Sequence, residues 1–189
     1  MTALRYRAGG FRQRTVAFAL LAVAALVVSA CGLVEEKKRY PCPKAFVLSD
    51  AGSLVRFKPG TGRDITDILF EARIADFAGT CEYDEKKKKG VSIEMNVVVD
   101  LQRGPASKTP DIAFEYFVAI PSFLPKPEGK KIFPVTGRFE ETQNRLTYRD
   151  AVRMFIPLDD PNDGVGLEVV VGFQLTPEEI RFNKALRQP

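Results

Sequence analysis

The stretch that decides the fold is "VSIEMNVVVDLQ", residues 91–102. Apolar side chains stand at every odd position from 91 to 101, and polar side chains fill the even positions except Val98. A period of two residues is that of an extended strand, whose successive side chains point to opposite faces. With one face apolar and the other polar, the stretch predicts a half-buried β-strand.

The same alternation recurs along the chain, which predicts an all-β fold. It is clear at 165–175, weaker at 68–75, 112–120 and 152–158, and shorter apolar stretches stand at 46–48, 54–57 and 132–139. The connectors carry turn residues, and Asp163-Gly164 is typical of a hairpin. Seven or eight strands at this spacing predict an antiparallel immunoglobulin-like β-sandwich over residues 44–175. The chain has no Trp to supply the buried one of immunoglobulin domains.

The sequence "TPEE", residues 176–179, marks the start of a helix. Thr176 suits the N-cap, Pro177 the first helical position and Glu179 the third, which together form a capping box. We therefore expect a short C-terminal helix and tail over residues 176–189. The helix is expected to pack across the sandwich or its open end.

The amino-terminal residues have the pattern of a secretory signal. Four arginines within the first fourteen residues precede an apolar segment at 16–30. This segment is shorter than the roughly 20 residues of a membrane-spanning helix, so a spanning anchor is the less favoured alternative. Residues 1–30 are predicted to be a cleaved signal peptide.

The signal ends in "VSAC", residues 28–31, which resembles the lipobox of bacterial lipoproteins. The resemblance implies that the Cys31 sulfur receives diacylglycerol, that cleavage precedes it, and that the new amino terminus is acylated. Two or more acyl chains give a stable membrane anchor. Gly32 in place of Asp implies transfer to an outer membrane. A structural role for Cys31 is the alternative.

Three further stretches, "RGPAS", "YFVAI" and "GFQLTPEEI", are similar to a group of uncharacterised proteobacterial outer-membrane lipoproteins. This resemblance covers about residues 42–183 and implies no activity.

With Cys31 lipidated, the remaining cysteines, Cys42 and Cys81, form an even pair in an oxidising compartment. A disulfide between them is therefore expected, and two buried free thiols are the alternative. Closing a loop of about 40 residues stabilises a fold by about 4 kcal/mol on the chain-entropy estimate.

Removal of the signal changes the charge. The leader carries four of the 28 basic residues and no acidic residue, which leaves 24 basic against 24 acidic residues. A net charge of zero gives no ground for a nucleic-acid partner. Residues 31–43 are expected to be a lipidated tether, whose ten residues from 32 to 41 reach at most about 35 Å.

The sequence contains no recognisable catalytic constellation. The chain has no histidine, which removes the commonest general base and metal ligand. "PGTGRD" at 59–64 lacks the features of a phosphate loop, and "DDPNDG" at 159–164 departs from a calcium loop. Asp50, Asp64, Asp67 and Glu71 cluster in sequence, but nothing in the pattern distinguishes them from solvated charges of loops and strand edges. We predict no catalytic residue, no metal site and no cofactor.

Two basic stretches are candidates for binding. Residues 86–89 are four lysines at a predicted hairpin tip, either solvated or in contact with lipid phosphates or acidic glycans. The irregular stretch "PSFLPKPEGKK", residues 121–131, is stiffened by proline. It is either pinned by its own aromatic side chain or forms a partner-binding tip made of Phe123, Leu124, Lys126, Lys130 and Lys131.

The sequence therefore predicts a lipid-anchored protein of the bacterial cell envelope, in the outer membrane and facing the periplasm. It is expected to act as a non-catalytic binding or assembly module for an envelope protein partner. The alternatives are an envelope glycan or small-ligand binder and, less favoured, a carboxylate-based hydrolase. A flat apolar patch favours the first, an enclosed apolar pocket the second and a facing carboxylate pair the third.

Overall fold

The computed structural model describes residues 39–60 and 62–187. The predicted signal peptide, the predicted lipobox and Cys31 lie outside the described residues. Nearly all of the described chain belongs to one compact unit, Tyr40–Pro189. Within the described ranges, no helix has the length and the apolar composition needed to cross a membrane.

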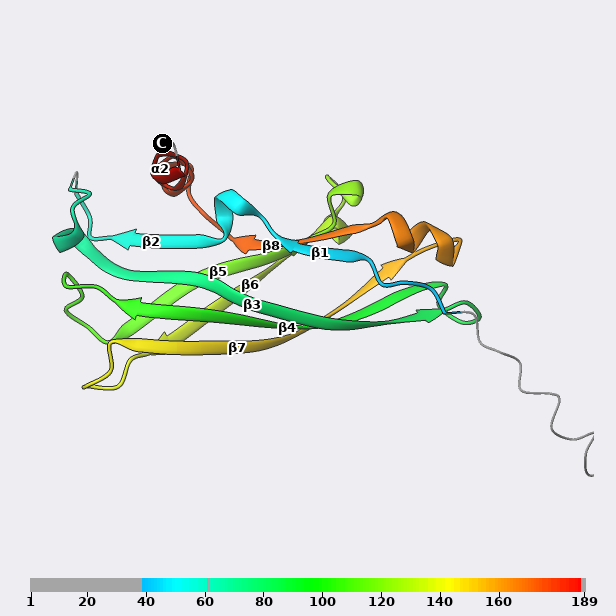
Figure 1. Cartoon of the computed structure of the whole chain (residues 1–189), viewed down its shortest axis with the longest axis horizontal. Coiled ribbons are helices and arrows are strands. Elements are labelled where there is room, and N and C mark those ends of the chain that lie inside the picture. Colours follow the sequence, from blue (N-terminus) through cyan, green and yellow to red (C-terminus); the bar gives the residue numbers. More distant parts are fainter. Residues whose placement is uncertain (1–38, 61, 188–189) are drawn as a thin grey trace, which may run out of the picture. The chain divides into compact units, whose positions relative to one another are not determined.

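The described residues form two four-stranded sheets that pack face to face, which confirms a β-sandwich (Figure 1). In chain order the strands are β1 (Lys44–Val47), β2 (Ser53–Phe57), β3 (Ile68–Asp84), β4 (Gly90–Arg103), β5 (Asp111–Ala119), β6 (Lys130–Arg138), β7 (Arg145–Pro157) and β8 (Glu168–Phe173). One sheet has the order β2-β3-β4-β7 and the other β1-β8-β5-β6.

The strand predicted from residues 91–102 is β4, and it lies at the centre of its sheet. It pairs antiparallel with β3 from Asp84↔Gly90 to Phe70↔Arg103, and with β7 on its other side. Its odd-numbered side chains face the second sheet, where Val91, Val97 and Val99 have no exposed surface. Burying each such side chain stabilises the fold by about 1.5–3 kcal/mol, so the alternation fixes which face of the sheet forms the core.

β3 is longer than the predicted strand at 68–75, because it continues to Asp84. The register shifts between Ile74 and Asp76, where a β-bulge inserts Ala75. A bulge changes which residues point inward, so the alternation that begins at Ile68 does not continue in phase.

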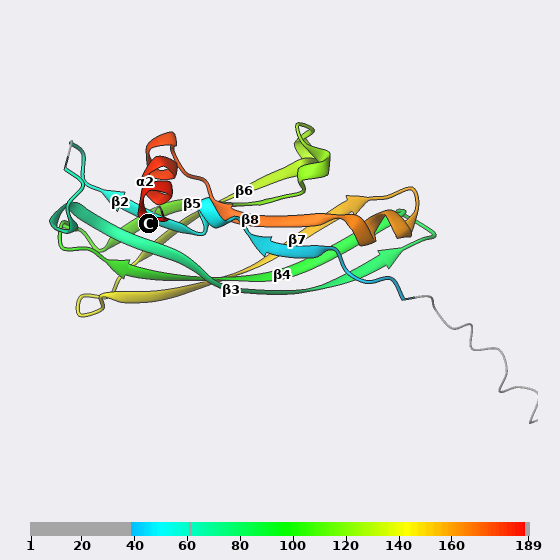
Figure 2. The same ribbon diagram turned by 45° about the horizontal axis from the view of Figure 1, so that its top comes forward.

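One pairing corrects the expectation of a purely antiparallel sandwich, because β1 runs parallel to β8. These strands are at opposite ends of the sequence, so no hairpin makes them antiparallel. After β1 the chain turns through a 3-10 helix, Ser49–Ala51, and β2 then pairs with β3 in the other sheet. β1 and β2 thus lie along one edge of the sandwich and divide it between the two sheets (Figure 2).

The hairpin predicted at Asp163-Gly164 is wrong. β7 and β8 belong to different sheets, so the chain between them crosses over instead of making a tight turn. Residues Pro161–Gly166 form a 3-10 helix, and the Asp160 carboxylate accepts a hydrogen bond from the backbone N–H of Asn162 at 2.8 Å. This helix takes the first residues of the stretch predicted as a strand, and β8 begins at Glu168.

The predicted helix is confirmed as α2, Pro177–Arg187, together with its capping box. The Thr176 N–H donates to the Glu179 carboxylate at 2.8 Å, and the Glu179 N–H donates to Thr176 Oγ1 at 3.2 Å. The helix lies over β2, where the buried Asn183 amide donates to the carbonyls of Asp50 and Ser53 at 3.0 and 2.8 Å.

The predicted disulfide between Cys42 and Cys81 is also confirmed, with Cα atoms 5.7 Å apart. Two further contacts hold the same segment on β3. The Tyr83 hydroxyl donates to the Pro41 carbonyl at 2.9 Å, and the Tyr83 ring lies 5.2 Å from the Tyr40 ring. The end of the predicted tether is therefore fixed on the second half of β3.

Candidate functional site

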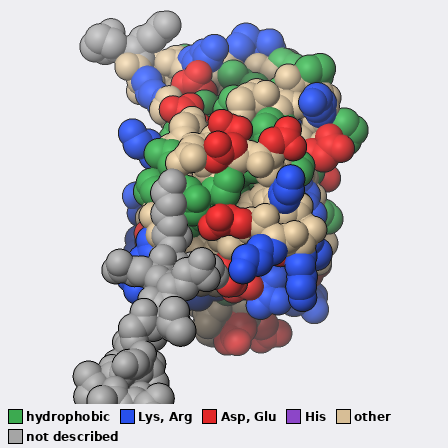
Figure 3. All heavy atoms as spheres, turned by 90° about the vertical axis from the view of Figure 1, so that its right-hand side faces the viewer, with side chains coloured by type: hydrophobic (Ala, Val, Ile, Leu, Met, Phe, Trp, Pro, Cys, Tyr) green, Lys and Arg blue, Asp and Glu red, His purple; other side chains and the backbone are tan. Residues whose placement is uncertain are grey.

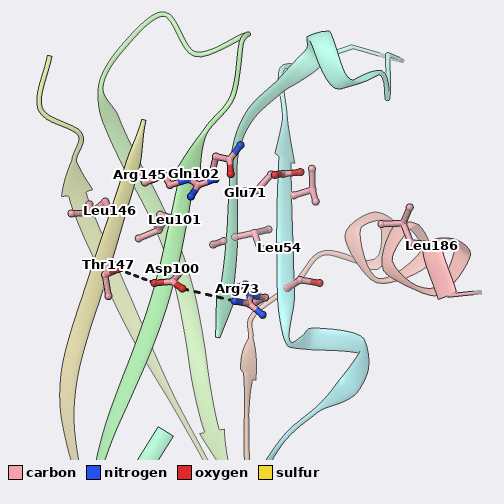
Figure 4. Close-up of a pocket in the computed structure, with 13 residues that line it drawn as sticks. Leu54, Glu71, Arg73, Asp100, Leu101, Gln102, Arg145, Leu146, Thr147 and Leu186 are labelled. Atoms are coloured by element: carbon pink, nitrogen blue, oxygen red, sulfur yellow. Dashed lines mark hydrogen bonds and ion pairs between the residues drawn. The ribbon is translucent and has the colours of Figure 1, made fainter. Parts of the chain in front are cut away.

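A groove of about 690 Å³ lies on the outer face of the sheet β2-β3-β4-β7 (Figure 4). The strand register places its side chains in two rows that cross all four strands. One row is Val55, Glu71, Gln102 and Arg145, and the other is Ser53, Arg73, Asp100 and Thr147. Leu186 of α2, which is 68% exposed, forms the wall beyond β2.

Cross-strand contacts hold the second row in place. The Arg73 guanidinium lies 3.9 Å from the Asp100 carboxylate, and the Thr147 hydroxyl donates to the same carboxylate at 2.8 Å. Directly opposed residues of opposite charge stabilise a sheet by about 0.2–1 kcal/mol. Both partners of Asp100 come from neighbouring strands, so the carboxylate already has its hydrogen-bonding role within the fold.

The first row differs because its polar side chains lack such partners. Within the described ranges, no hydrogen bond or ion pair joins the side chains of Glu71, Gln102 or Arg145 to another residue. Glu71 and Arg145 lie two strands apart, which is about 10 Å at the usual strand spacing. The row thus presents an acid, an amide and a base in line, and all three can bond to a ligand.

The four carboxylates that cluster in sequence do not gather at one site. Asp50 contacts Arg187 of α2 at 3.0 Å, and Glu71 alone faces the groove. The Asp64 side chain accepts a hydrogen bond from the N–H of Thr66 at 3.3 Å. A hydrogen bond from Lys58 lowers the pKa of Asp67 below its usual range. Three of the four therefore stabilise loops or the helix contact.

Gly62 and Asp64, from the stretch "PGTGRD", both lie against Asp67. A side chain at position 62 would overlap the Asp67 carboxylate, so this loop needs Gly62 for close approach. Asp67 also accepts a hydrogen bond from the Asp64 N–H at 3.1 Å. Such a loop places negative charge where a phosphate would need hydrogen-bond donors. In the part of the chain that is described, no three His, Cys, Asp or Glu side chains gather as a group that could hold a metal ion.

The proline-rich loop divides the predicted apolar tip between two environments. Phe123 is half-buried and packs against the core, whereas Leu124 is 50% exposed. The 3-10 helices Pro121–Phe123 and Pro127–Gly129 fold the loop back on itself. The loop is therefore anchored by its aromatic side chain and shows one leucine to solvent.

The three lysines predicted to rim this tip have different surroundings. The Lys130 ammonium donates to the Gln174 side chain at 2.7 Å and lies 4.3 Å from the centre of the Phe117 ring. The Lys131 ammonium lies 5.2 Å from the Phe133 ring, and Lys126 is exposed. Their role in partner binding stays a prediction.

The four lysines form the tip of the β3-β4 hairpin. The Asp84 carboxylate accepts hydrogen bonds from the N–H groups of Lys86 and Lys87 at 3.0 and 2.9 Å, and these bonds lower the Asp84 pKa. Basic and acidic side chains are interspersed on this end of the sandwich (Figure 3). The tip is therefore shaped by its neighbouring acid.

Among the polar residues of the groove, the sequence predicts that Glu71 and Arg73 belong to the strand at 68–75 and that Asp100 and Gln102 lie on the polar face of the strand at 91–102. Arg145 and Thr147 carry no signal of their own. The rows come from the register of four strands, and a single sequence does not specify a register between strands far apart.

No family model, no curated protein and no solved structure matches this chain.

Proposed function

We propose that this protein is a lipid-anchored, non-catalytic binding module of the bacterial cell envelope, and that it holds a protein partner in the groove over β2, β3, β4 and β7. The observation that carries the proposal is the row of Glu71, Gln102 and Arg145, which line one groove without side-chain partners in the described fold. Gln102 and Arg145 are exposed, and Glu71 is half-buried. Acid and base about 10 Å apart suit a partner surface with the opposite order of charges.

The anchor would hold the groove away from the membrane. The tether precedes Cys42, which is bonded to Cys81 on the second half of β3. Arg73 in the groove lies eight residues back along the same strand, or roughly 26 Å at the rise of a β-strand. A partner in the groove therefore meets the module at the part of β3 that is remote from the attachment point.

The non-catalytic assignment is supported by what the carboxylates do. Asp50, Asp67 and Asp100 each contact a basic side chain of the fold. Glu71 is the one carboxylate of the groove that has no such contact within the described ranges. Glycoside hydrolysis needs two carboxyl groups that face each other with the reacting bond between them.

Glycan binding is the second candidate. The groove has the volume of a small-ligand site, which is typically about 300–1,000 Å³, and it is lined by amide, hydroxyl and guanidinium groups. It is open to solvent, however, whereas a small-molecule site encloses most of its ligand. This property favours the protein partner.

The immunoglobulin-like topology is part of the proposal. Two four-stranded sheets with the N-terminal edge divided between them support it. The meander β2-β3-β4 departs from the ABED and CFG strand orders of constant-type domains. The proposed likeness to an immunoglobulin domain therefore lies in the two packed sheets and in the divided N-terminal edge. The order in which the strands are connected differs.

The proposal is tested by exchanging the charges of the row. A Glu71→Arg, Arg145→Glu double variant keeps the net charge but reverses the order of charges in the groove. The matched control exchanges Asp111 and Arg138, an exposed ion pair at 3.2 Å on the other sheet. We expect the groove variant to lose a component that co-purifies with the anchored wild type, while the control keeps it. The same components on both variants, with unchanged thermal midpoints, would contradict the proposal.

A further inference from the structure

The second half of β3 is an open sheet edge. β2 pairs with β3 only as far as Arg73, and residues 74–84 have β4 on one side and none of the described strands on the other. The cause is the division of the N-terminal edge, because β1 pairs with β8 instead of continuing along β3 (Figure 2). Such an edge is a template for another strand.

The backbone direction along this edge follows from one hydrogen bond. The Phe77 N–H donates to the Asp76 carboxylate at 2.8 Å, so it points away from β4. In an antiparallel pair the N–H and C=O groups of alternate residues point to the same side. The backbone groups of Gly79 and Cys81 therefore face the open edge, while Phe77 already has a partner for its donor.

An apolar hollow of about 100 Å³ lies beside this edge. It is lined by Ala45, Phe77, Ile93, Met95 and Val169 and by the disulfide, so it opens into the seam between the two sheets. The buried Ile93, Met95 and Val169 connect it to the core. At this volume it is too small for a typical ligand, which needs about 300 Å³ or more, and suits a single apolar side chain.

Gly79 keeps the hollow open. A Cβ at this position would lie 2.7 Å from the backbone oxygen of Glu94, so a side chain there would displace β4. Phe77 and Cys81, on the same side of the strand, are half-buried. A side chain from outside is therefore the group that can fill this space without moving the sheet.

The charges at the edge specify its occupant. Residues 74–85 include four acids and no basic residue. Asp76 and Glu82 are exposed, three positions before and after Gly79. A second copy paired antiparallel about Gly79 would set Asp76 opposite Glu82, and directly opposed like charges destabilise a sheet. The edge thus favours a basic strand over a copy of itself.

We propose that the open edge at residues 76–82 binds an extended segment of a partner protein by β-strand addition. That segment has an aliphatic residue opposite Gly79 and a Lys or Arg three positions before and after it. Paired residues point to the same face, so the aliphatic side chain enters the hollow while the basic ones meet Asp76 and Glu82. This edge is separate from the groove, and its test is independent of the groove ligand.

The test uses fluorescent seven-residue peptides and the detergent-extracted full protein. The probe is Lys-Thr-Thr-Val-Thr-Thr-Lys. One control peptide has Glu at both ends, and another has Asp in place of Val. We expect the probe to bind and both controls to bind at least about tenfold more weakly, as judged by fluorescence anisotropy. Equal binding of all three peptides, or of none, overturns the proposal.

A protein variant separates this site from general attraction to acidic surfaces. In Asp76→Lys, Glu82→Lys the preference should invert, so that the Glu-ended peptide binds better than the probe. The matched control Asp111→Lys, Glu140→Lys removes two exposed acids elsewhere and should leave the preference unchanged. Probe binding that appears only after residues 31–38 are removed would assign the edge to the chain's own tether and overturn the proposal.

Discussion

Cys42 and Cys81 join the first described residues of the chain to the half of β3 whose one neighbour among the described strands is β4. The bond acts where β1 has left that sheet, so it holds the two sheets together along an edge that backbone pairing does not close. It also fixes the point at which the predicted tether reaches the sandwich.

Removing this bond should destabilise the sandwich without unfolding it. Because the disulfide closes a loop of 39 residues in sequence separation, a Cys42→Ser, Cys81→Ser variant should lose about 4 kcal/mol. For a domain of this size that is a fall of roughly 10 °C in thermal midpoint. Calorimetry with and without reductant measures it. A reduced wild type that melts at the oxidised temperature would show that the bond contributes nothing.

A hydrogen bond between the two sheets should make the free energy of unfolding depend on pH in the alkaline range. The buried Tyr116 hydroxyl of β5 donates to the Asp150 carboxylate of β7 at 2.6 Å. Burial first, and then the carboxylate, raise the Tyr116 pKa well above its usual value. Replacing Tyr116 with Phe leaves Asp150 without this donor, which should cost about 1.5–3 kcal/mol at neutral pH.

The sign of the pH effect follows from the raised pKa. Above about pH 10 the tyrosine ionises in the unfolded chain but not in the folded one, so the unfolded state binds fewer protons and stability falls by up to about 1.4 kcal/mol per pH unit. The stability gap between wild type and Tyr116→Phe should therefore shrink from pH 9 to pH 11. Urea unfolding at these pH values measures the gap, and a constant gap would contradict the assignment.

The strands were predictable where the alternation of side chains is unbroken. Residues 91–102 specify β4 because one of its faces is buried in the core along the whole stretch and the other carries polar side chains except Val98. The second half of β3 was not predictable, because the bulge at Ala75 changes the phase and Ala78, Gly79 and Thr80 are too small to mark a buried face. The segment that is hardest to predict is therefore the one for which strand addition is proposed.

The capping box and the disulfide were predictable because each depends on few residues. Thr176 and Glu179 are three positions apart, and two cysteines leave one pairing. The groove was not predictable, since Glu71, Gln102 and Arg145 come from three strands whose register is set by the whole core. The parallel pairing of β1 and β8 depends on the same tertiary packing.

The proline-rich loop should respond differently at its two apolar residues. Phe123 is half-buried against the core, so Phe123→Ala should cost about 2 kcal/mol and lower the thermal midpoint by about 6 °C. Leu124→Ala removes an exposed side chain and should leave the midpoint within about 1 °C. Equal losses would contradict the separation. A loss of co-purifying partners in Leu124→Ala alone would support the predicted docking role, and an unchanged set would end it.

The lipid anchor is tested at Cys31. The lipobox predicts that Cys31→Ser blocks lipidation and leaves an uncut precursor. Intact-mass spectrometry of the membrane-extracted protein should find a diacylglyceryl and an acyl group on the wild type and neither on the variant. A wild type that keeps its leader, or carries an unmodified Cys31, would remove the anchor from this account.

The central claim, that a partner protein occupies the groove, is tested most directly by photo-cross-linking in intact cells. A photoreactive amino acid replaces Thr147, an exposed residue of the groove, and in the control it replaces Thr136, an exposed residue of the other sheet. The account predicts a discrete cross-linked protein species from position 147 that is absent from position 136 and is lost when Glu71 and Arg145 exchange charges. No cross-link from position 147, or the same species from both positions, would contradict it.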